Sequence, residues 1–298
     1  MAAMRVLIFG GRGMLGSDLG PELVRRGCIV SSPSSGEANV VDPTQVAEWL
    51  GKGWDWVVNL AAYTQVDKAE IETDCAIAVN ALGAGYVARA CAIHGTPLLH
   101  VGSDFVFDGA LRRPYTEADP TNPLGAYART KRQGEEAVLL SGARAMLVRT
   151  AWLFGPHGSS FPRTILRAAR AGKPLRVVDD QTGSPTYTTD LSRVLADLID
   201  LGPEPGVYHA AGPEPMTWHE LAVRTLRAAG IDAPVEPIGT EDWPTPATRP
   251  AYSVLSFEKC AGLGIAPMRP IDEALREFIV RLEPEDQTPA AGIRQEHR

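Results

Sequence analysis

Val6-Leu-Ile-Phe9 leads directly into Gly10-Gly-Arg-Gly13-Met-Leu-Gly16 near the start of the chain. Four consecutive apolar residues are typical of a buried parallel strand. The glycines are spaced G-x-x-G-x-x-G, and a helical pattern follows them. Such glycines let the backbone approach a pyrophosphate, whose charge meets the free N–H groups of the helix start. The stretch predicts a dinucleotide site, with a structural turn as the alternative.

Strands and helices alternate beyond this stretch. Helices are expected from Asp42 to Leu50 and from Cys75 to His94, and buried strands at 56–60 and 98–101. This alternation predicts an α/β fold, a Rossmann-type doubly wound parallel sheet with helices on both faces. We expect a dinucleotide-binding domain at 1–149, on which a helix at 188–201 packs. A smaller α/β substrate-binding domain follows at 150–282, with a disordered tail at 283–298.

Composition restricts the class of protein. The 298 residues are 44% hydrophobic with a net charge of -7, which indicates a globular protein. Neither a basic run nor an apolar run of about 18 residues is found, so we expect no nucleic-acid partner and no membrane span. The four cysteines and six histidines show no metal-ligand spacing. We expect free thiols, no metal bound by such a motif, and a cytoplasmic protein.

Two stretches bear on the cofactor, the first on whether it is NADH or NADPH and the second on where it lies. Where an acidic residue would favour NAD and an arginine NADP, the chain has Ser31 and Ser32, which suit either cofactor. The segment Asn59–Thr64 follows a predicted strand, and its small Ala61 and Ala62 would let a cofactor lie against the backbone. Tight packing explains these alanines equally well. NADH and NADPH therefore both remain candidates.

Three further side chains suit carbonyl reduction. Tyr127 and Lys131 lie four positions apart, so they share one helix face, and the ammonium is expected to lower the pKa of the phenol. Ser103 follows the strand at 98–101 and offers a hydroxyl beside Asp104. A developing alkoxide needs a proton donor and a hydrogen-bond donor. We predict that Tyr127 and Ser103 fill these roles, although a solvated helix face and a turn serine are the alternatives.

These motifs resemble the extended short-chain dehydrogenase/reductase family. More closely, Arg149-Thr-Ala-Trp152-Leu-Phe-Gly155, 177–187 and Arg249-Pro-Ala-Tyr-Ser-Val-Leu255 resemble the dTDP-4-dehydrorhamnose reductase family over about Arg5 to Phe278. The resemblance implies NADPH- or NADH-dependent reduction of the C4 ketone of a dTDP-4-keto-6-deoxyhexose, dTDP-4-dehydro-L-rhamnose giving dTDP-L-rhamnose. It also implies a homodimer, with Mg²⁺ possible at the dimer contact but not assignable to residues.

The resemblance supplies most of the expected contacts. Ser103, Tyr127 and Lys131 would be catalytic, and Ser103, Asp104, Phe105 and Trp152 would bind the sugar. Tyr127 and Lys131 would also meet the cofactor. The remaining cofactor-binding residues would be Gly10, Gly13, Met14, Leu15, Gly16, Asn39, Val40, Ala61, Ala62, Tyr63 and Thr64.

Three positions depart from the family pattern. Ser103 and Phe105 stand where many members have Thr and Tyr, and Asn39 stands where Asp is frequent. Phe105 keeps open a reductase of another dTDP-sugar in an antibiotic pathway, for example a dihydrostreptose-type branched sugar. A non-enzymatic dinucleotide-binding subunit, like the regulatory subunit of methionine adenosyltransferase, is the second alternative. The proline-rich segment 234–250 is expected to form an ordered loop over the site.

Overall fold

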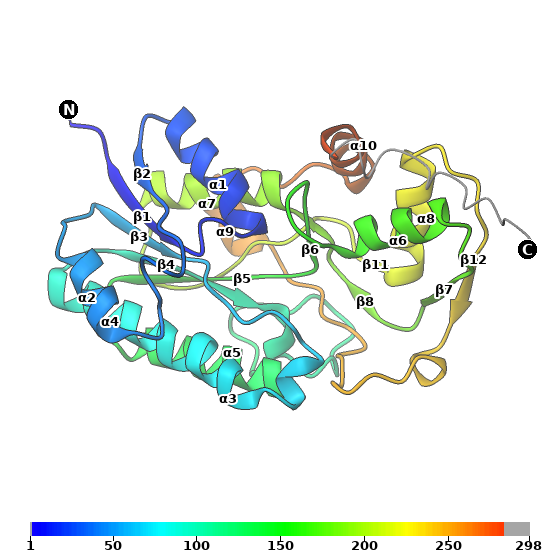
Figure 1. Ribbon diagram of the computed structural model, residues 1–298, viewed down its shortest axis with the longest axis horizontal. Helices are drawn as coiled ribbons and strands as arrows, with labels where there is room; N and C mark the ends of the chain where they lie inside the picture. Colours follow the sequence, from blue (N-terminus) through cyan, green and yellow to red (C-terminus); the bar gives the residue numbers. More distant parts are fainter. Residues whose placement is uncertain (1, 283–298) are drawn as a thin grey trace, which may run out of the picture.

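The computed structural model describes residues 2–282 and is built around a parallel sheet of six strands in the order β10-β5-β4-β3-β1-β2 (Figure 1). The α/β fold class is confirmed. The predicted tail at 283–298 lies outside the described residues. The strands are β1 (Arg5–Phe9), β2 (Ile29–Ser31), β3 (Trp56–Asn59), β4 (Leu98–Ser103), β5 (Ala145–Thr150) and β10 (Gly206–His209).

Helices cover both faces of this sheet because its strands are apolar on both sides. Along β1, Val6 and Ile8 point into one core, and Leu7 and Phe9 into the other. The first core is completed by α1 (Met14–Arg25), α7 (Thr188–Leu201) and α9 (Glu258–Gly262). The second is completed by α2 (Pro43–Leu50) and α4 (Ala84–His94), with α5 (Ala126–Leu139) alongside α4.

The helix that was expected from Cys75 to His94 is not uniform. It begins as α3 (Thr73–Ala76), becomes π-helical over Ile77–Gly83 and continues as α4. By length and composition this stretch is apolar enough to cross a membrane, although half of its apolar window is buried. Val87 and Cys91 pack in the core beneath the sheet, as expected for a core helix of a globular domain.

A smaller part lies at the other end of the molecule (Figure 1). Its core joins Phe154, Leu166, Leu221 and Phe278. The strands pair two by two, β7 with β12, β8 with β11 and β6 with β9. The elements are β6 (Leu153–Phe154), α6 (Phe161–Arg170), β7 (Leu175–Val178), β8 (Thr182–Gly183), β9 (Thr186–Tyr187), β11 (Met216–Thr217), α8 (Trp218–Ala228), β12 (Val235–Ile238) and α10 (Ile271–Arg281).

After the first elements of the smaller part, the chain returns to the large sheet and adds α7 and β10 to it. Leu191 and Leu195 of α7 pack in the same core as α1, and β10 pairs in parallel with β5 from Gly206↔Met146 to His209↔Arg149. The large sheet therefore contains residues from beyond position 149. The proline-rich segment also differs from expectation, because it begins as strand β12, which pairs with β7, and is a loop only beyond Ile238.

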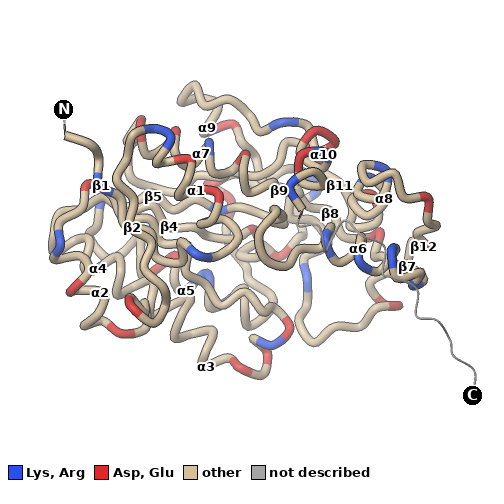
Figure 2. The backbone as a smooth tube through the Cα atoms, turned by 45° about the horizontal axis from the view of Figure 1, so that its top comes forward, with Lys and Arg blue, Asp and Glu red and all other residues tan. Residues whose placement is uncertain are grey.

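All four cysteines are free, as expected. Figure 2 shows basic and acidic segments interspersed over both parts of the fold. Several of these charges are paired across the surface; Arg26, for example, meets Asp197 and Asp200 at 2.7 Å each. Such exposed pairs add little stability individually, typically about 0 to 1 kcal/mol.

Gly16 determines how closely α1 approaches the glycine loop. A Cβ added at Gly16 would lie 2.4 Å from the Gly11 Cα, which is backbone and cannot rotate away. We expect Gly16→Ala to lower the free energy of unfolding by about 1–3 kcal/mol and to weaken dinucleotide binding. Denaturant titration and cofactor titration measure the two effects. Gly20→Ala on the same helix is the control, since nothing lies within 4 Å of its added Cβ; equal losses in both variants would contradict the prediction.

Candidate active site

The glycine loop joins β1 to α1, and five of the predicted cofactor residues lie in this loop and in the first turn of α1. Gly10 adopts a φ of +74°, and the Gly13 N–H donates to its carbonyl at 3.0 Å. Gly13 precedes the helix, and no side chain caps the first turn, so its free N–H groups suit an anion. A Cβ at Gly10 would lie 2.7 Å from the Ala61 N. The loops after β1 and β3 therefore meet as expected for a pyrophosphate cradle.

The loop after β3 is held by a side chain that the sequence analysis did not identify. Asn80, in the π-helical turn, accepts a hydrogen bond from Tyr63 N at 2.9 Å and donates to Tyr63 O at 3.1 Å. It also donates to Thr130 Oγ1 at 3.1 Å. Asn80 thereby connects the predicted cofactor loop to α5. The only sign of this role in the sequence was a single amide side chain in a largely apolar stretch.

Asn39 and Val40 lie beyond β2, where the adenosine end was predicted. The Asn39 side chain accepts from Val41 N at 3.2 Å, as in an Asx turn. Val40 is buried in the core, where its side chain packs against the position of Gly83. The Val40 side chain is thus structural, and any nucleotide contact there falls to its backbone. Tyr63 donates from its phenol to Glu72 at 2.5 Å, while Thr64 is exposed.

Ser103 and Tyr127 are neighbours although 24 positions separate them. Ser103 ends β4, where its Oγ lies 3.2 Å from Asp104 Oδ1 and accepts from Phe105 N at 3.2 Å. Tyr127, in the first turn of α5, lies close enough to the Ser103 hydroxyl for that hydroxyl to favour the phenolate. The Phe105 and Tyr127 rings meet edge to face at 5.6 Å. The structure therefore brings the two predicted donors together at the carboxyl end of the sheet.

Lys131 lies one turn beyond Tyr127 and is buried. Its Nζ donates to Val101 O at 2.8 Å, and burial lowers its pKa to about 8, partly opposed by the Glu135 carboxylate. Burial raises the pKa of Tyr127 to about 12, although the Ser103 hydrogen bond opposes this shift. The expectation that Lys131 lowers the phenol pKa is therefore wrong for this arrangement. Desolvation determines the pKa of Tyr127, because the Lys131 ammonium points toward β4 and not toward the phenol.

Glu70 fixes the start of the helix that carries Tyr127. Its Oε1 accepts from Ala126 N at 2.7 Å, and a Cβ at Gly125 would lie 2.8 Å from the same oxygen. We expect Glu70→Ala to cost about 1 kcal/mol of stability, because it leaves a first-turn N–H without its partner. Thermal unfolding measures this loss, and Glu72→Ala on the exposed side is the control. An unchanged midpoint in Glu70→Ala would contradict the assigned role.

Trp152 lies where the two parts of the fold meet. It has a φ of +45°, unlike the other non-glycine residues that the structure describes. Its indole stacks on Trp218 at 3.5 Å between ring centroids, and a Cβ at Gly183 would lie 2.3 Å from the Trp152 ring. The Trp218 Nε1 donates to Gln181 at 3.2 Å. Trp152 is thus held by two partners that the sequence analysis did not assign to the site.

A strap formed by residues 249–255 connects the two parts. Arg249 holds Asp67 through both terminal nitrogens, at 3.1 and 2.8 Å. Farther along, Ser253 N donates to Thr182 O and Tyr115 N donates to Val254 O, each at 2.8 Å. The strap therefore places Ser253 near Asp104, where its hydroxyl favours the ionised form of that carboxyl and so lowers its pKa.

Comparison with known proteins agrees with this geometry. A family described as RmlD substrate binding domain matches residues 4–283. The chain belongs to this RmlD family. It is 42% identical to dTDP-4-dehydrorhamnose reductase of Mycolicibacterium smegmatis, with 93% of this chain and 85% of that protein aligned. A probable dTDP-4,6-dihydroxy-2-methyloxan-3-one 4-ketoreductase of Streptomyces antibioticus is 41% identical, with 92% and 94% aligned.

Solved structures give the same family. The dTDP-4-dehydrorhamnose reductase of Bacillus anthracis, solved in complex with NADP, has a TM-score of 0.90 and 31% identity, covering 94% of this chain and 99% of that one. The predicted family resemblance is therefore confirmed over nearly the whole chain.

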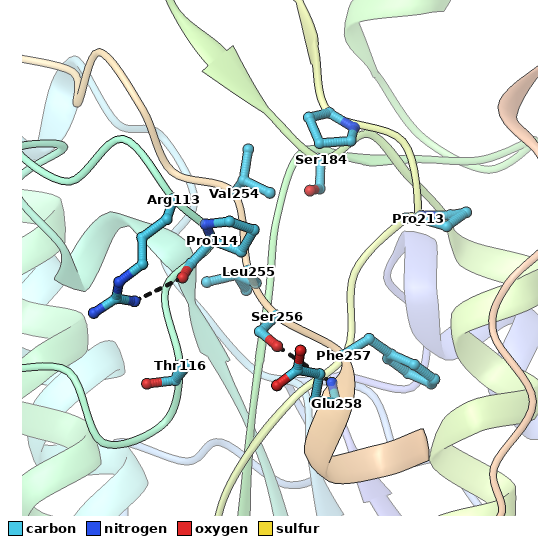
Figure 3. Close-up of a pocket in the computed structure, with 12 residues that line it drawn as sticks. Arg113, Pro114, Thr116, Ser184, Pro213, Val254, Leu255, Ser256, Phe257 and Glu258 are labelled. Carbon is cyan, nitrogen blue, oxygen red and sulfur yellow. Dashed lines mark hydrogen bonds between the residues drawn. The ribbon is translucent and has the colours of Figure 1, made fainter. Parts of the chain in front are cut away.

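The RmlD-family chain also has a hollow outside this cluster. A cavity of about 560 Å³ lies beside the strap. Figure 3 shows Pro114, Ser184, Pro213 and Phe257 among the residues that line it. None of the sequence-predicted site residues lines it. Within residues 2–282, no three His, Cys, Asp or Glu side chains gather closely enough to hold a metal ion. Mg²⁺ at a dimer contact is unsupported.

Proposed function

We propose that this RmlD-family protein reduces the ketone of a dTDP-linked sugar with NADPH. The observation that carries the proposal is the neighbouring pair of Ser103 and Tyr127, with Lys131 one turn away, at the sheet edge where the glycine loop lies. Ligands of open parallel sheets bind at this edge. Relatives at about 40% identity that are named dTDP-sugar reductases support the same function.

The chain's own residues fit a dinucleotide. The uncapped start of α1 and the glycines of the loop would hold the pyrophosphate, and Ala61 would lie beside it. Arg12, in the same loop, has an exposed guanidinium 3.2 Å from Glu37, and an arginine near this position accommodates a 2′-phosphate. The NADP bound in the Bacillus anthracis relative supports NADPH over NADH. The nicotinamide supplies the hydride.

Three side chains would bind the reactants and protonate the ketone oxygen. Ser103 would donate a hydrogen bond to the carbonyl, and Tyr127 would transfer its phenolic proton to the oxyanion that forms on hydride addition. The Lys131 ammonium lies on the same helix face, where it would bind the cofactor ribose. Phe105 and Trp152 would border the sugar.

The substrate that we favour is dTDP-4-dehydro-L-rhamnose, converted to dTDP-L-rhamnose. Several relatives carrying the corresponding enzyme name support it. Phe105, which removes a phenol beside the sugar, favours a second candidate, another dTDP-sugar ketone of an antibiotic pathway, as does the Streptomyces antibioticus relative. The intact Ser103, Tyr127 and Lys131 argue against a purely regulatory dinucleotide-binding subunit.

One assay separates these functions. The protein is incubated with dTDP-4-keto-6-deoxy-L-lyxo-hexulose and either NADPH or NADH, and cofactor absorbance and the sugar product are followed. We expect rapid consumption of NADPH and formation of dTDP-L-rhamnose. Consumption only with another dTDP-ketosugar would support the second candidate, and cofactor binding without consumption would remove the reductase function.

We also propose a cytoplasmic homodimer. The four unpaired cysteines support a reducing compartment. Sedimentation of the purified protein tests the assembly, and a monomer at micromolar concentration would contradict it.

A further inference from the structure

The Ser103 hydroxyl has three neighbours but only one proton. Its oxygen accepts from Phe105 N–H at 3.2 Å, lies 3.2 Å from Asp104 Oδ1 and has the Tyr127 phenol beside it. A hydroxyl donates one hydrogen bond and accepts two. The direction of the Ser103 proton therefore depends on whether Asp104 is ionised.

The two forms of Asp104 leave different donors for a ketone. An ionised carboxylate only accepts, so it accepts a hydrogen bond from the Ser103 hydroxyl, and the neighbouring Tyr127 phenol can donate to the remaining lone pair of Ser103 Oγ. Neither hydroxyl is free in that arrangement. A protonated Asp104 instead donates to Ser103 Oγ, which already accepts from Phe105 N–H. Both lone pairs are then used, and the protons of Ser103 and Tyr127 are available to a substrate oxygen.

We propose that Asp104 is a positioning residue that works as a neutral carboxylic acid, donating a hydrogen bond to Ser103 so that the Ser103 hydroxyl turns toward the ketone. The inference rests on the proposed reductase function and deepens it. Asp104 keeps its proton throughout turnover, because the proton delivered to the sugar comes from Tyr127. Asp104 acts through Ser103 and not through the reacting atoms.

The surroundings of Asp104 favour the neutral form. The side chain is buried, and this burial raises its pKa to about 7, although the hydroxyls of Ser253 and Ser103 and the backbone N–H groups of Asp104 and Phe105 oppose the shift. Within the described part of the chain, Asp104 Oδ2 has no hydrogen-bond partner, which would be costly for a charged oxygen.

Among the described residues of the elements packed around Asp104, no positively charged side chain forms an ion pair with its carboxyl. Tyr127 faces it from α5 and Ser253 from the strap. Lys131 and Glu135 lie one and two turns farther along α5, and the Lys131 ammonium donates to Val101 O instead. The carboxyl therefore titrates in a pocket of neutral neighbours, where its charged form is the disfavoured one.

The test compares Asp104→Asn with Asp104→Leu across pH. An Asn amide can donate to Ser103 at every pH, whereas Leu cannot. Single-turnover hydride transfer from NADPH to the dTDP-ketosugar is expected to fall about tenfold per pH unit above about pH 7 in the parent, as the carboxyl ionises. Asp104→Asn should stay within a few-fold of the parent at about pH 6 and lose the fall that begins near pH 7, keeping only the fall that begins near pH 8 as the Lys131 ammonium deprotonates. Asp104→Leu should be about 100-fold slower throughout.

Two results would overturn the proposal. One is an Asp104→Asn rate as low as that of Asp104→Leu, and the other is an alkaline fall that begins near pH 7 in Asp104→Asn as it does in the parent. Thermal unfolding and NADPH titration establish that each variant is folded.

A second measurement does not need turnover. The infrared spectrum of the parent minus that of Asp104→Asn should contain a carboxylic acid C=O band that disappears as the pH rises through about 7. Its absence at about pH 6 would overturn the proposal. A titrating band in a protein that reduces no dTDP-ketosugar would support the neutral carboxyl and count against the proposed function instead.

Discussion

Tyr127→Phe should lower kcat for ketone reduction by about 100-fold while NADPH affinity stays nearly unchanged. The phenol is the proton donor in the proposed reaction, and its removal leaves the oxyanion without a positioned acid. The ring itself remains, so the edge-to-face contact with Phe105 persists. Stopped-flow measurement of cofactor oxidation gives the rate, and fluorescence titration gives the affinity.

A matched control keeps this result interpretable. Tyr63→Phe removes a phenol that is hydrogen-bonded to Glu72 and lies in the predicted cofactor loop. Because that phenol takes no part in proton transfer to the ketone, kcat should change only a few-fold. Turnover retained by Tyr127→Phe, or an equal loss in both variants, would remove Tyr127 from its proposed role.

The fold was predictable where apolar pattern and chain order agree. In β1, continuous apolar sequence followed by glycines determines a buried strand and the turn after it. β10 was harder to place, because its pairing with β5 joins residues about 60 positions apart and depends on α7 packing beside α1. A short strand carries no sequence signal for the sheet it will join.

The site was predictable only where its chemistry is local. Tyr127 and Lys131 share a helix, and Ser103 follows a strand, so periodicity and position identify them. Asn80 and Glu70 act on backbone groups of other segments, Tyr63 and Ala126, and no spacing in the sequence relates such pairs. The pKa of Tyr127 also depends on burial, which sequence spacing does not reveal.

Glu135→Ala should lower the free energy of unfolding by about 3–5 kcal/mol. Glu135 and Arg149 form a buried ion pair beneath the site, with Arg149 Nη2 2.8 Å from Glu135 Oε2. A Cβ at Gly102 would lie 2.6 Å from Glu135 Oε1, so β4 approaches this carboxylate closely. Removing the carboxylate leaves a buried guanidinium without its counter-charge. Urea denaturation of parent and variant measures the loss.

A change at Arg149, the partner of Glu135, shows where the loss of stability in Glu135→Ala comes from. If the cost comes from the unpaired Arg149, then Glu135→Leu combined with Arg149→Met should recover much of the stability, because replacing both charges removes the desolvation penalty as well as the attraction. Glu135 also raises the pKa of Lys131, so both variants should lower that pKa further and reduce turnover near neutral pH. A double variant less stable than Glu135→Ala would show that shape, not charge, determines this part of the core.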